Sequence, residues 1–141
     1  MNIKYSINQN DHFITFCKKG SLDKISNSFD DIDSDKNTLL LYDKNIKKSI
    51  VDKIFNELKV SGCRIIKKEC KGSKTNKNEN FLFQIINILL ENKFTKKSVV
   101  IACGGGVVGD VAALASSLYL RGLYYFSIPT TITAMIDSSI G

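Results

Sequence analysis

Three consecutive glycines, Gly104, Gly105 and Gly106, separate an apolar run from a stretch of small residues. Glycine loses more conformational freedom on folding than any other residue, so such a cluster indicates either tight packing or a ligand that approaches the backbone. With Gly109, the spacing fits the GxGxxG pattern of dinucleotide-binding turns, but the acidic residue that should follow about 20 positions later is absent. Spacing alone leaves two alternatives open, a tight turn without a ligand and a phosphate-binding loop.

Polar side chains that could serve such a loop follow it along the chain. Asp110 falls in the first turns of the helix expected after the glycines, where a carboxylate either stabilises the helix N-terminus or contacts a ribose or a substrate. Thr130 and Thr131 follow Pro129, and they either cap the next helix or face a ligand. Asp137 comes about two helical turns later and can return to the same end of the site.

Arg121 is one of only two arginines, Arg64 being the other, among 20 basic residues in a chain of net charge +6. A surface ion pair is its ordinary role, but a bidentate guanidinium also suits a phosphate or carboxylate. The lysines are spread along the chain instead of being clustered with arginines and aromatic residues, which disfavours nucleic-acid binding. Anionic small molecules are the partners that this charge favours.

The elements that must position these residues follow from hydrophobic patterning. Short apolar runs predict four strands, at residues 37–42, 63–68, 98–103 and 123–128, and the first and third of them are expected to be buried. Helical spacing of apolar residues predicts helices at residues 48–60, 80–92 and 107–120 and from residue 130 onward. Strands that alternate with helices are typical of βαβ units, so we expect an α/β fold, a Rossmann-like parallel sheet with helices on both faces. The glycine loop and the loop of Pro129, Thr130 and Thr131 would then both lie outside the carboxyl ends of strands, where ligands of such sheets bind.

Weaker patterns concern the second helix and the first 36 residues. Residues 80–92 have almost no charge, which predicts a helix that is buried on more than one side. In residues 1–36, the segments 3–7 and 12–17 alternate as two strands or a hairpin, and residues 22–29 are compatible with a helix. We treat residues 1–141 as one domain, with its first 36 residues as a β/α start.

Cysteine and histidine usage predicts no metal site. Cys17, Cys63, Cys70 and Cys103 form no CxxC pair, and His12 is the single histidine. The cysteines are expected to be small buried hydrophobic residues. Neither a leader-like N-terminus nor a run of 18 or more apolar residues is present, so we expect a cytoplasmic protein in a reducing compartment that does not associate with membranes.

Four motifs in order, GGGVVGD, YLRG, PTT and DSSIG, closely resemble the 3-dehydroquinate synthase family of sugar-phosphate cyclases. The resemblance runs from about residue 37 to residue 141 and is most specific from Ile101 onward. It implies an N-terminal α/β lobe that binds NAD and a C-terminal helical lobe that holds a catalytic divalent metal, zinc or cobalt. The chain ends before that helical lobe and its metal ligands, so we expect the nucleotide-binding lobe alone, without turnover.

The same resemblance implies the site residues. It assigns NAD contacts to Asp43, Asn45, Lys77, Gly104, Gly105, Gly106, Val107, Asp110, Thr130 and Thr131. It assigns catalytic roles to Asp137, at the substrate end of the site, and to Arg121, which reaches the substrate phosphate of a neighbouring subunit and so implies a homodimer.

One family motif is altered. Where the family usually carries GExxK, this chain reads KGSKTNK and offers no glutamate. Counting back from the glycine triplet aligns Lys77 with the family lysine and Lys74 with the glutamate, whereas anchoring on Gly72 aligns Ser73 and Asn76 instead.

The implied reaction is the NAD-dependent cyclisation of 3-deoxy-arabino-heptulosonate 7-phosphate to 3-dehydroquinate with loss of phosphate, a step of the shikimate pathway. Ala113 and Leu114 replace a typical Gly-Phe pair, and ITAMID replaces LLAQVD, so another sugar-phosphate cyclase is an alternative. A metal-dependent alcohol dehydrogenase shares the general architecture but is not expected to carry YLRG, PTT and DSSIG together. A non-catalytic nucleotide-binding module is the alternative from a different class.

Overall fold

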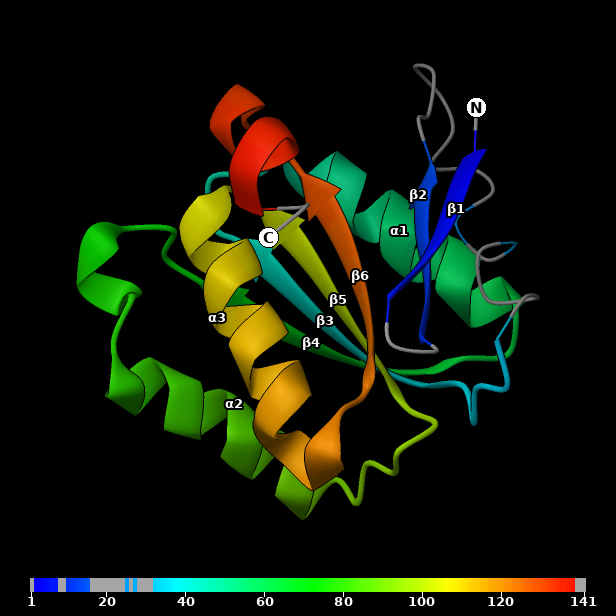
Figure 1. Cartoon of the computed structure of the whole chain (residues 1–141). Helices are drawn as coiled ribbons and strands as arrows, with labels where there is room; N and C mark the ends of the chain where they lie inside the picture. The colour runs from blue at the N-terminus through cyan, green and yellow to red at the C-terminus, as the bar shows by residue number, and fades with distance from the viewer. Residues whose placement is uncertain (1, 8–9, 16–24, 26, 28–31, 139–141) are drawn as a thin grey trace.

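A four-stranded parallel sheet forms the centre of the molecule (Figure 1), in a computed structural model that describes residues 2–7, 10–15, 25, 27 and 32–138. Its strands are β3 (Asn37–Asp43), β4 (Arg64–Cys70), β5 (Val99–Gly104) and β6 (Tyr124–Pro129). They lie in the order β4-β3-β5-β6, and every neighbouring pair is parallel. All four predicted strands are thereby confirmed.

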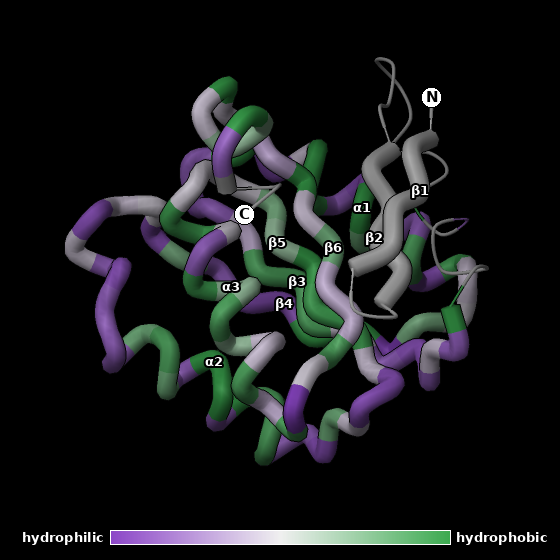
Figure 2. Tube along the Cα trace, in the orientation of Figure 1, coloured by the Kyte–Doolittle hydropathy of each residue, from purple (hydrophilic) through white to green (hydrophobic). Residues whose placement is uncertain are grey.

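Helices cover both faces of this sheet, as predicted. They are α1 (Lys48–Val60), α2 (Glu79–Glu91) and α3 (Gly106–Leu118). Figure 1 shows α1 behind the sheet and α2 and α3 in front of it. Successive side chains of a strand point to opposite faces, so Leu40 packs with the apolar face of α1 while Leu39 and Leu41 pack with α2 and α3. Figure 2 shows the resulting apolar centre, in which every residue of β5 is buried.

The burial predicted for the second helix is wrong. One stripe of α2 is buried, at Phe81, Ile85 and Leu89, but Phe83 is 58% exposed and Leu90 is 57% exposed. The helix lies at the rim of the α/β layer (Figure 1), and its buried stripe packs with residues of α3 and the sheet, with Phe94 and with Tyr119. Hydrophobicity was therefore a poor guide to how many neighbours surround this helix.

The N-terminal strands form a hairpin, which is one of the two arrangements that the sequence left open. β1 (Asn2–Ile7) pairs antiparallel with β2 (Asn10–Thr15) in a separate two-stranded sheet. The helix predicted at residues 22–29 falls almost entirely outside the described residues. At the other end of the chain, the helix predicted from residue 130 is a short helical segment that contains the π-helix η4 (Ala134–Ser138).

The remaining general expectations concern cysteines and membranes. Cys63, Cys70 and Cys103 are buried and unpaired, as expected, and Cys17 lies outside the described residues. In the described part of the chain, the helices are all too short or too polar to cross a membrane.

Candidate functional site

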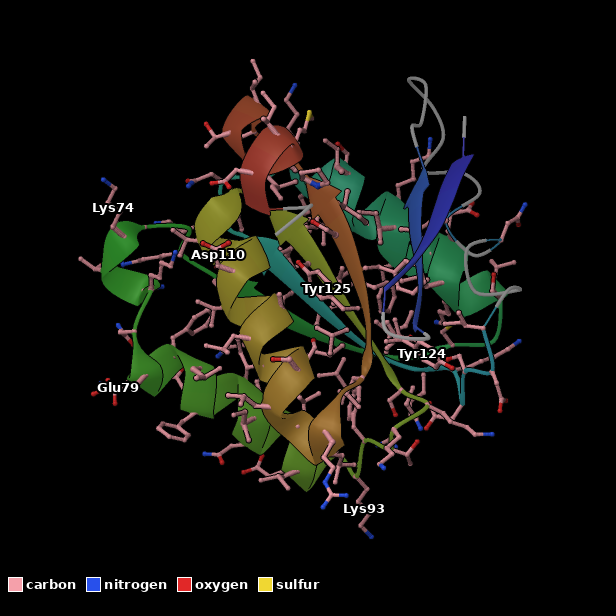
Figure 3. The ribbon with its side chains drawn as sticks, viewed as in Figure 1. Lys74, Glu79, Lys93, Asp110, Tyr124 and Tyr125 are labelled. Carbon is pink, nitrogen blue, oxygen red and sulfur yellow. The ribbon has the colours of Figure 1, made fainter. Side chains whose placement is uncertain are left out.

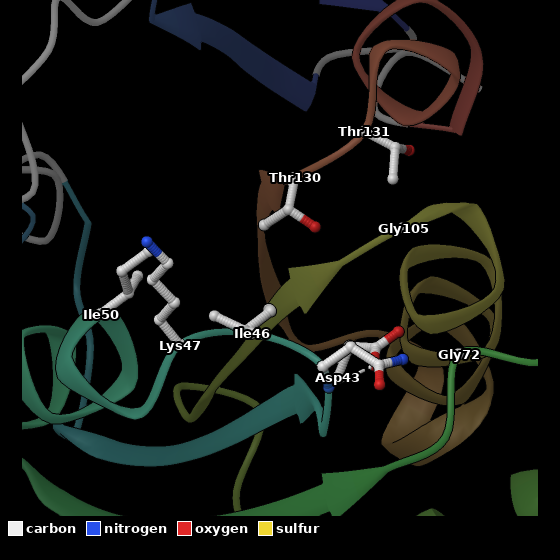
Figure 4. Close-up of a pocket in the computed structure, with 9 residues that line it drawn as sticks. Asp43, Ile46, Lys47, Ile50, Gly72, Gly105, Thr130 and Thr131 are labelled. Carbon is white, nitrogen blue, oxygen red and sulfur yellow. Dashed lines mark hydrogen bonds between the residues drawn. The ribbon is translucent and has the colours of Figure 1, made fainter.

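The carboxyl ends of three strands converge on one pocket of about 370 Å³ (Figure 4). It is lined by Asp43, Asn45, Ile46, Lys47, Ile50, Gly72, Gly105, Thr130 and Thr131. Five of these nine residues were assigned to the site from the sequence, namely Asp43, Asn45, Gly105, Thr130 and Thr131. Residues from the ends of β3, β5 and β6 meet here because those strands are adjacent in the sheet.

The glycine loop satisfies both of its open interpretations, at different positions. A Cβ atom on Gly104 would lie 2.8 Å from the Cβ of Val108, so this glycine allows α3 to pack closely on β5. Gly105 has φ −80°, which any residue can adopt, and it borders the pocket. It is the N-cap of α3 and has no side chain with which to cap that helix. The first N–H groups of α3, at Gly106 and Val107, therefore remain available to an anion.

The loop after β6 is held against the glycine loop. Thr130 N donates a hydrogen bond to Gly104 O at 2.9 Å, and the Thr130 side chain faces the pocket (Figure 4). Thr131 Oγ1 accepts a hydrogen bond from Ala134 N at 3.2 Å. Thr131 thus caps the following helical segment, the ordinary role considered for it, while also bordering the pocket.

Asp43 ends β3 and places a carboxylate at the pocket. Asn45 N donates to Asp43 Oδ1 at 2.9 Å, which fixes one oxygen in a local turn. The other oxygen lies against Gly72, where a Cβ atom would be only 1.8 Å from Asp43 Oδ2.

A second polar cluster lies beside the first turns of α3. Lys77 Nζ contacts Asp110 Oδ2 at 2.6 Å (Asp110 is labelled in Figure 3), although the Lys77 side chain is 59% exposed. The hydrogen bond from Lys77 to Asp110 raises the pKa of Lys77, and the charges of Asp110 and Asp137 raise it further. The helical segment that carries Asp137 contacts α3, so Asp137 returns to this end of the molecule. Tyr125 OH donates to Gly109 O at 3.2 Å. Burial raises the pKa of Tyr125, and the charge of Asp110 raises it further.

The other candidate residues in the loop between β4 and α2 point away from this cluster or are hydrogen-bonded within the loop. Lys74 projects outward from this loop (Figure 3). Ser73 Oγ is hydrogen-bonded to Thr75 Oγ1 at 2.7 Å, and Asn76 Nδ2 donates to Lys71 O at 2.9 Å.

Arg121 lies apart from both clusters. It follows the last turn of α3 and precedes β6, so it is at the amino end of the sheet, whereas the pocket is at the carboxyl end. Tyr119 OH donates to Phe94 O at 3.0 Å and anchors this segment. Leu120 and Arg121 then adopt left-handed φ values of 49° and 67°, and Arg121 is exposed. The predicted helix at residues 107–120 ends early, at Leu118, for this reason.

Two buried thiols near Asp43, Cys70 and Cys103, do not supply a nucleophile. Burial, followed by the charge of Asp43, raises the pKa of Cys70 to about 12 and that of Cys103 to about 11. Cys70 Sγ also donates to Tyr42 O at 3.2 Å. Both groups stay neutral thiols at physiological pH.

Sequence reasoning missed four of the lining residues, Ile46, Lys47, Ile50 and Gly72. Ile46 and Lys47 follow Asp43 in the connection to α1, and Ile50 lies in the first turn of α1, so their proximity to Asp43 along the chain was an available signal. Gly72 had been noted only as an alignment anchor. Across the described residues, no group of three or more His, Cys, Asp or Glu side chains is placed to hold a metal ion.

Comparison with known proteins identifies the family. The sequence profile of the family described as 3-dehydroquinate synthase N-terminal matches residues 67–141. The chain belongs to the 3-dehydroquinate synthase family. It is 32% identical over 139 residues to 3-dehydroquinate synthase of Ruminiclostridium cellulolyticum, and 34% identical over 139 residues to that of Clostridium acetobutylicum. These matches cover 99% of this chain but only 39% of either relative, so the chain spans about two fifths of their length.

Solved structures confirm the sugar-phosphate cyclase fold. A crystal structure of 2-deoxy-scyllo-inosose synthase, complexed with carbaglucose-6-phosphate, NAD+ and Co2+, superposes with a TM-score of 0.82 at 18% identity. The superposition covers 98% of this chain and 37% of the 2-deoxy-scyllo-inosose synthase chain. The 2-epi-5-epi-valiolone synthase ValA of Streptomyces hygroscopicus, with NAD+ and Zn2+ bound, gives a TM-score of 0.66 at 25% identity over 72% of this chain and 29% of its own.

Proposed function

We propose that residues 1–141 form the NAD-binding domain of a 3-dehydroquinate synthase, a lyase that closes a carbocycle from 3-deoxy-arabino-heptulosonate 7-phosphate with loss of phosphate in the shikimate pathway. The observation that carries this proposal is the pocket itself. Asp43, Gly105 and Thr130, which family resemblance assigns to NAD, lie at the carboxyl ends of three different strands and border the same space.

The residues of this pocket fit a dinucleotide. The uncapped first turn of α3 offers N–H groups and the positive end of a helix dipole to the pyrophosphate, and Gly105 keeps the approach free of side chains. Asp43 carries a carboxylate that can accept hydrogen bonds from ribose hydroxyls. Asn45 supports that carboxylate and borders the same end of the pocket. Thr130 and Thr131 would face the nicotinamide end.

Lys77 and Asp110 flank the cofactor site as an ion pair. The contact of Lys77 with Asp110 supports the alignment that matches Lys77, and not Asn76, to the family lysine, because Asn76 is bonded within its own loop. Lys77 would then present its ammonium group beside the pyrophosphate loop, with Asp110 fixing its direction. Asp137 lies close enough to act on the same ammonium group electrostatically and would contact the substrate.

The chemistry that bound NAD supplies is a transient oxidation of a substrate hydroxyl, which acidifies the neighbouring C–H bond and lets phosphate leave. The share of this chain is to bind the dinucleotide, to orient it and to hold charged groups at the substrate end. The divalent metal of the family, zinc or cobalt, would be held outside these 141 residues and would act as a Lewis acid. The unpaired buried thiols support a cytoplasmic location.

Arg121 would act on a second subunit. It is exposed at the amino end of the sheet, far along α3 from the pocket, so it fits a role in the site of a partner better than a role in its own. We therefore propose a homodimer in which Arg121 binds the substrate phosphate across the interface.

Calorimetric titration of the 141-residue chain with NAD+ tests the cofactor assignment. Saturable one-to-one binding is expected, without phosphate release from the heptulosonate phosphate. A chain that binds no NAD+ would contradict the proposal.

A chimera tests the reaction and the dimer. It joins residues 1–141 to the remaining part of the Clostridium acetobutylicum relative and is supplied with NAD+ and Zn2+; it should release phosphate from the heptulosonate phosphate. Mixing Arg121→Ala and Asp137→Asn chimeras, each inactive alone, should restore part of the activity through mixed dimers. Turnover of only another sugar phosphate would instead favour a different cyclase, the alternative raised by Ala113 and Leu114. NAD+ binding by the chain with an inactive chimera would favour a non-catalytic nucleotide-binding module.

A further inference from the structure

Gly72 is a glycine for reasons of space and not of conformation. The glycines with positive φ in the described residues are Gly62 and Gly122, so the backbone of Gly72 is one that other residues can adopt. A Cβ atom on Gly72, however, would lie 1.8 Å from Asp43 Oδ2 and 3.0 Å from Asp43 Cγ. The position admits no side chain as long as the Asp43 carboxylate keeps its place.

The sheet brings these two residues together. Asp43 is the last residue of β3, and it pairs with Cys70, the last residue of β4. Lys44 N donates to Cys70 O at 2.9 Å, which extends this register past the strand ends. The chain leaving β4 therefore passes Asp43 two residues later, at Gly72, and both residues border the pocket.

The position of the carboxylate thus depends on two neighbours, one that binds it and one that leaves it space. Asn45 N binds Oδ1, and the open space over Gly72 receives Oδ2. A methyl group at residue 72 would occupy the position of Oδ2. Because a carboxylate is the rotatable end of a short side chain, the expected response is its rotation out of the pocket and not the loss of the fold.

We propose that Gly72 is a positioning residue which, by leaving space for the Asp43 carboxylate, sets the affinity for the adenosine ribose diol and the preference for NAD over NADP. This inference rests on the proposed function. A carboxylate at that place accepts hydrogen bonds from the 2′-hydroxyl of NAD and repels the 2′-phosphate of NADP. Displacing it weakens the first interaction and relieves the second.

Titration of NAD+ and NADP+ into the 141-residue chain and its variants tests the inference. Gly72→Ala is expected to lose about tenfold in NAD+ affinity, the loss of roughly one hydrogen bond to a charged group, and to discriminate less against NADP+. The double variant Asp43→Ala/Gly72→Ala should bind NAD+ as Asp43→Ala does, because Gly72 acts through Asp43. Thr75→Ala, a substitution in the same loop outside the pocket, is the control and should bind like the unaltered chain.

A ligand-free readout complements these titrations. The amide N–H of Asn45 donates to Asp43 Oδ1, so its NMR shift should move in Gly72→Ala and stay unchanged in Thr75→Ala. If Gly72→Ala fails to fold, adding Asp43→Ala should restore folding, because it removes the clashing carboxylate.

Three results would overturn the inference: unchanged NAD+ binding in Gly72→Ala, additive losses in the double variant, or a folding defect that Asp43→Ala does not relieve. Absence of NAD+ binding by the unaltered chain would instead contradict the proposed function, so the two failures are distinguishable.

Discussion

The two edges of the central sheet, the amino edge where its strands begin and the carboxyl edge where they end, differ in how their polar groups are hydrogen-bonded. At the amino edge, Asp35 accepts hydrogen bonds from Thr95 Oγ1 at 2.6 Å, Ser98 Oγ at 2.9 Å and Asn37 N at 3.0 Å. At the carboxyl edge, the first turn of α3 has no side-chain cap, and one oxygen of Asp43 rests against the bare backbone of Gly72. At the amino edge, the Asp35 carboxylate is thus hydrogen-bonded by groups of the protein itself, whereas at the carboxyl edge the N-cap Gly105 offers no side chain to the first N–H groups of α3.

This difference separates stability from binding within one small domain. Substitutions at the amino edge should lower the free energy of unfolding and leave dinucleotide affinity unchanged. Substitutions at the carboxyl edge should affect affinity, except where a residue also supports packing. Arg121 is the exception at the amino edge, because it is exposed and lies in a strained backbone, a combination that functional residues often show.

The largest effect is expected for Tyr119→Ala at the amino edge. The side chain is buried, and its hydroxyl bonds Phe94 O, so its loss should lower the free energy of unfolding by about 3–5 kcal/mol in urea denaturation. Tyr119→Phe removes only the hydroxyl and should cost about 1 kcal/mol. If either variant that still folds shows weaker NAD+ binding, the separation of the two edges is incorrect.

Within the carboxyl edge, substitutions of Gly104 and Gly105 should differ in their effects on stability and on NAD+ affinity. Gly104→Ala places a methyl group 2.8 Å from Val108 Cβ and should cost about 1–3 kcal/mol of unfolding free energy. In Gly105→Ala the new methyl group is 3.4 Å from Thr131 Cγ2, and the cost should stay below about 1 kcal/mol. Calorimetry should nevertheless show weaker NAD+ binding for Gly105→Ala. Equal costs in stability would remove the distinction between the packing glycine and the ligand-facing one.

The acid dependence of stability should depend on Asp35. Burial alone would raise the pKa of this carboxyl, but the hydrogen bonds from Thr95, Asn37 and Ser98 outweigh it and lower the pKa below 3.8. The carboxylate thus contributes stability fully above pH 3.8, and the contribution is lost as the pH falls through the lower folded-state value.

Asp35→Asn should remove this dependence and cost about 1 kcal/mol at neutral pH. Urea denaturation of both proteins from pH 7 down to pH 3 measures the effect. Parallel pH curves for the two proteins would show that Asp35 is not the responsible group.

The smallest effect is expected for Leu120→Gly. Leu120 has φ 49° and is 44% exposed, so glycine relieves backbone strain while little packing is lost. The free energy of unfolding should rise by about 0.5–1 kcal/mol. A thermal melt of this variant beside Leu118→Gly, which has helical φ and should be destabilised, provides the matched comparison.

The strands, the three long helices and the two loops that border the pocket could be predicted from the sequence. Apolar spacing reports which face of a segment is buried, and turn residues mark where segments end, so residues 37–42 and 48–60 were placed within one residue of their observed bounds. The burial of α2 could not be predicted, because it depends on which neighbours reach Phe83 and Leu90 and not on their hydrophobicity.

The sequence by itself determined the local elements and, through family motifs, most of the residues that border the pocket. Only the tertiary structure decided which of them meet. The carboxylate sought after the glycine loop faces the pocket from Asp43, which precedes that loop in the chain, because β3 pairs directly with β5. Gly72 reaches Asp43 through the pairing of β4 with β3. Strand order is set by hydrogen bonds between segments distant in sequence, and no local pattern of residues encodes it.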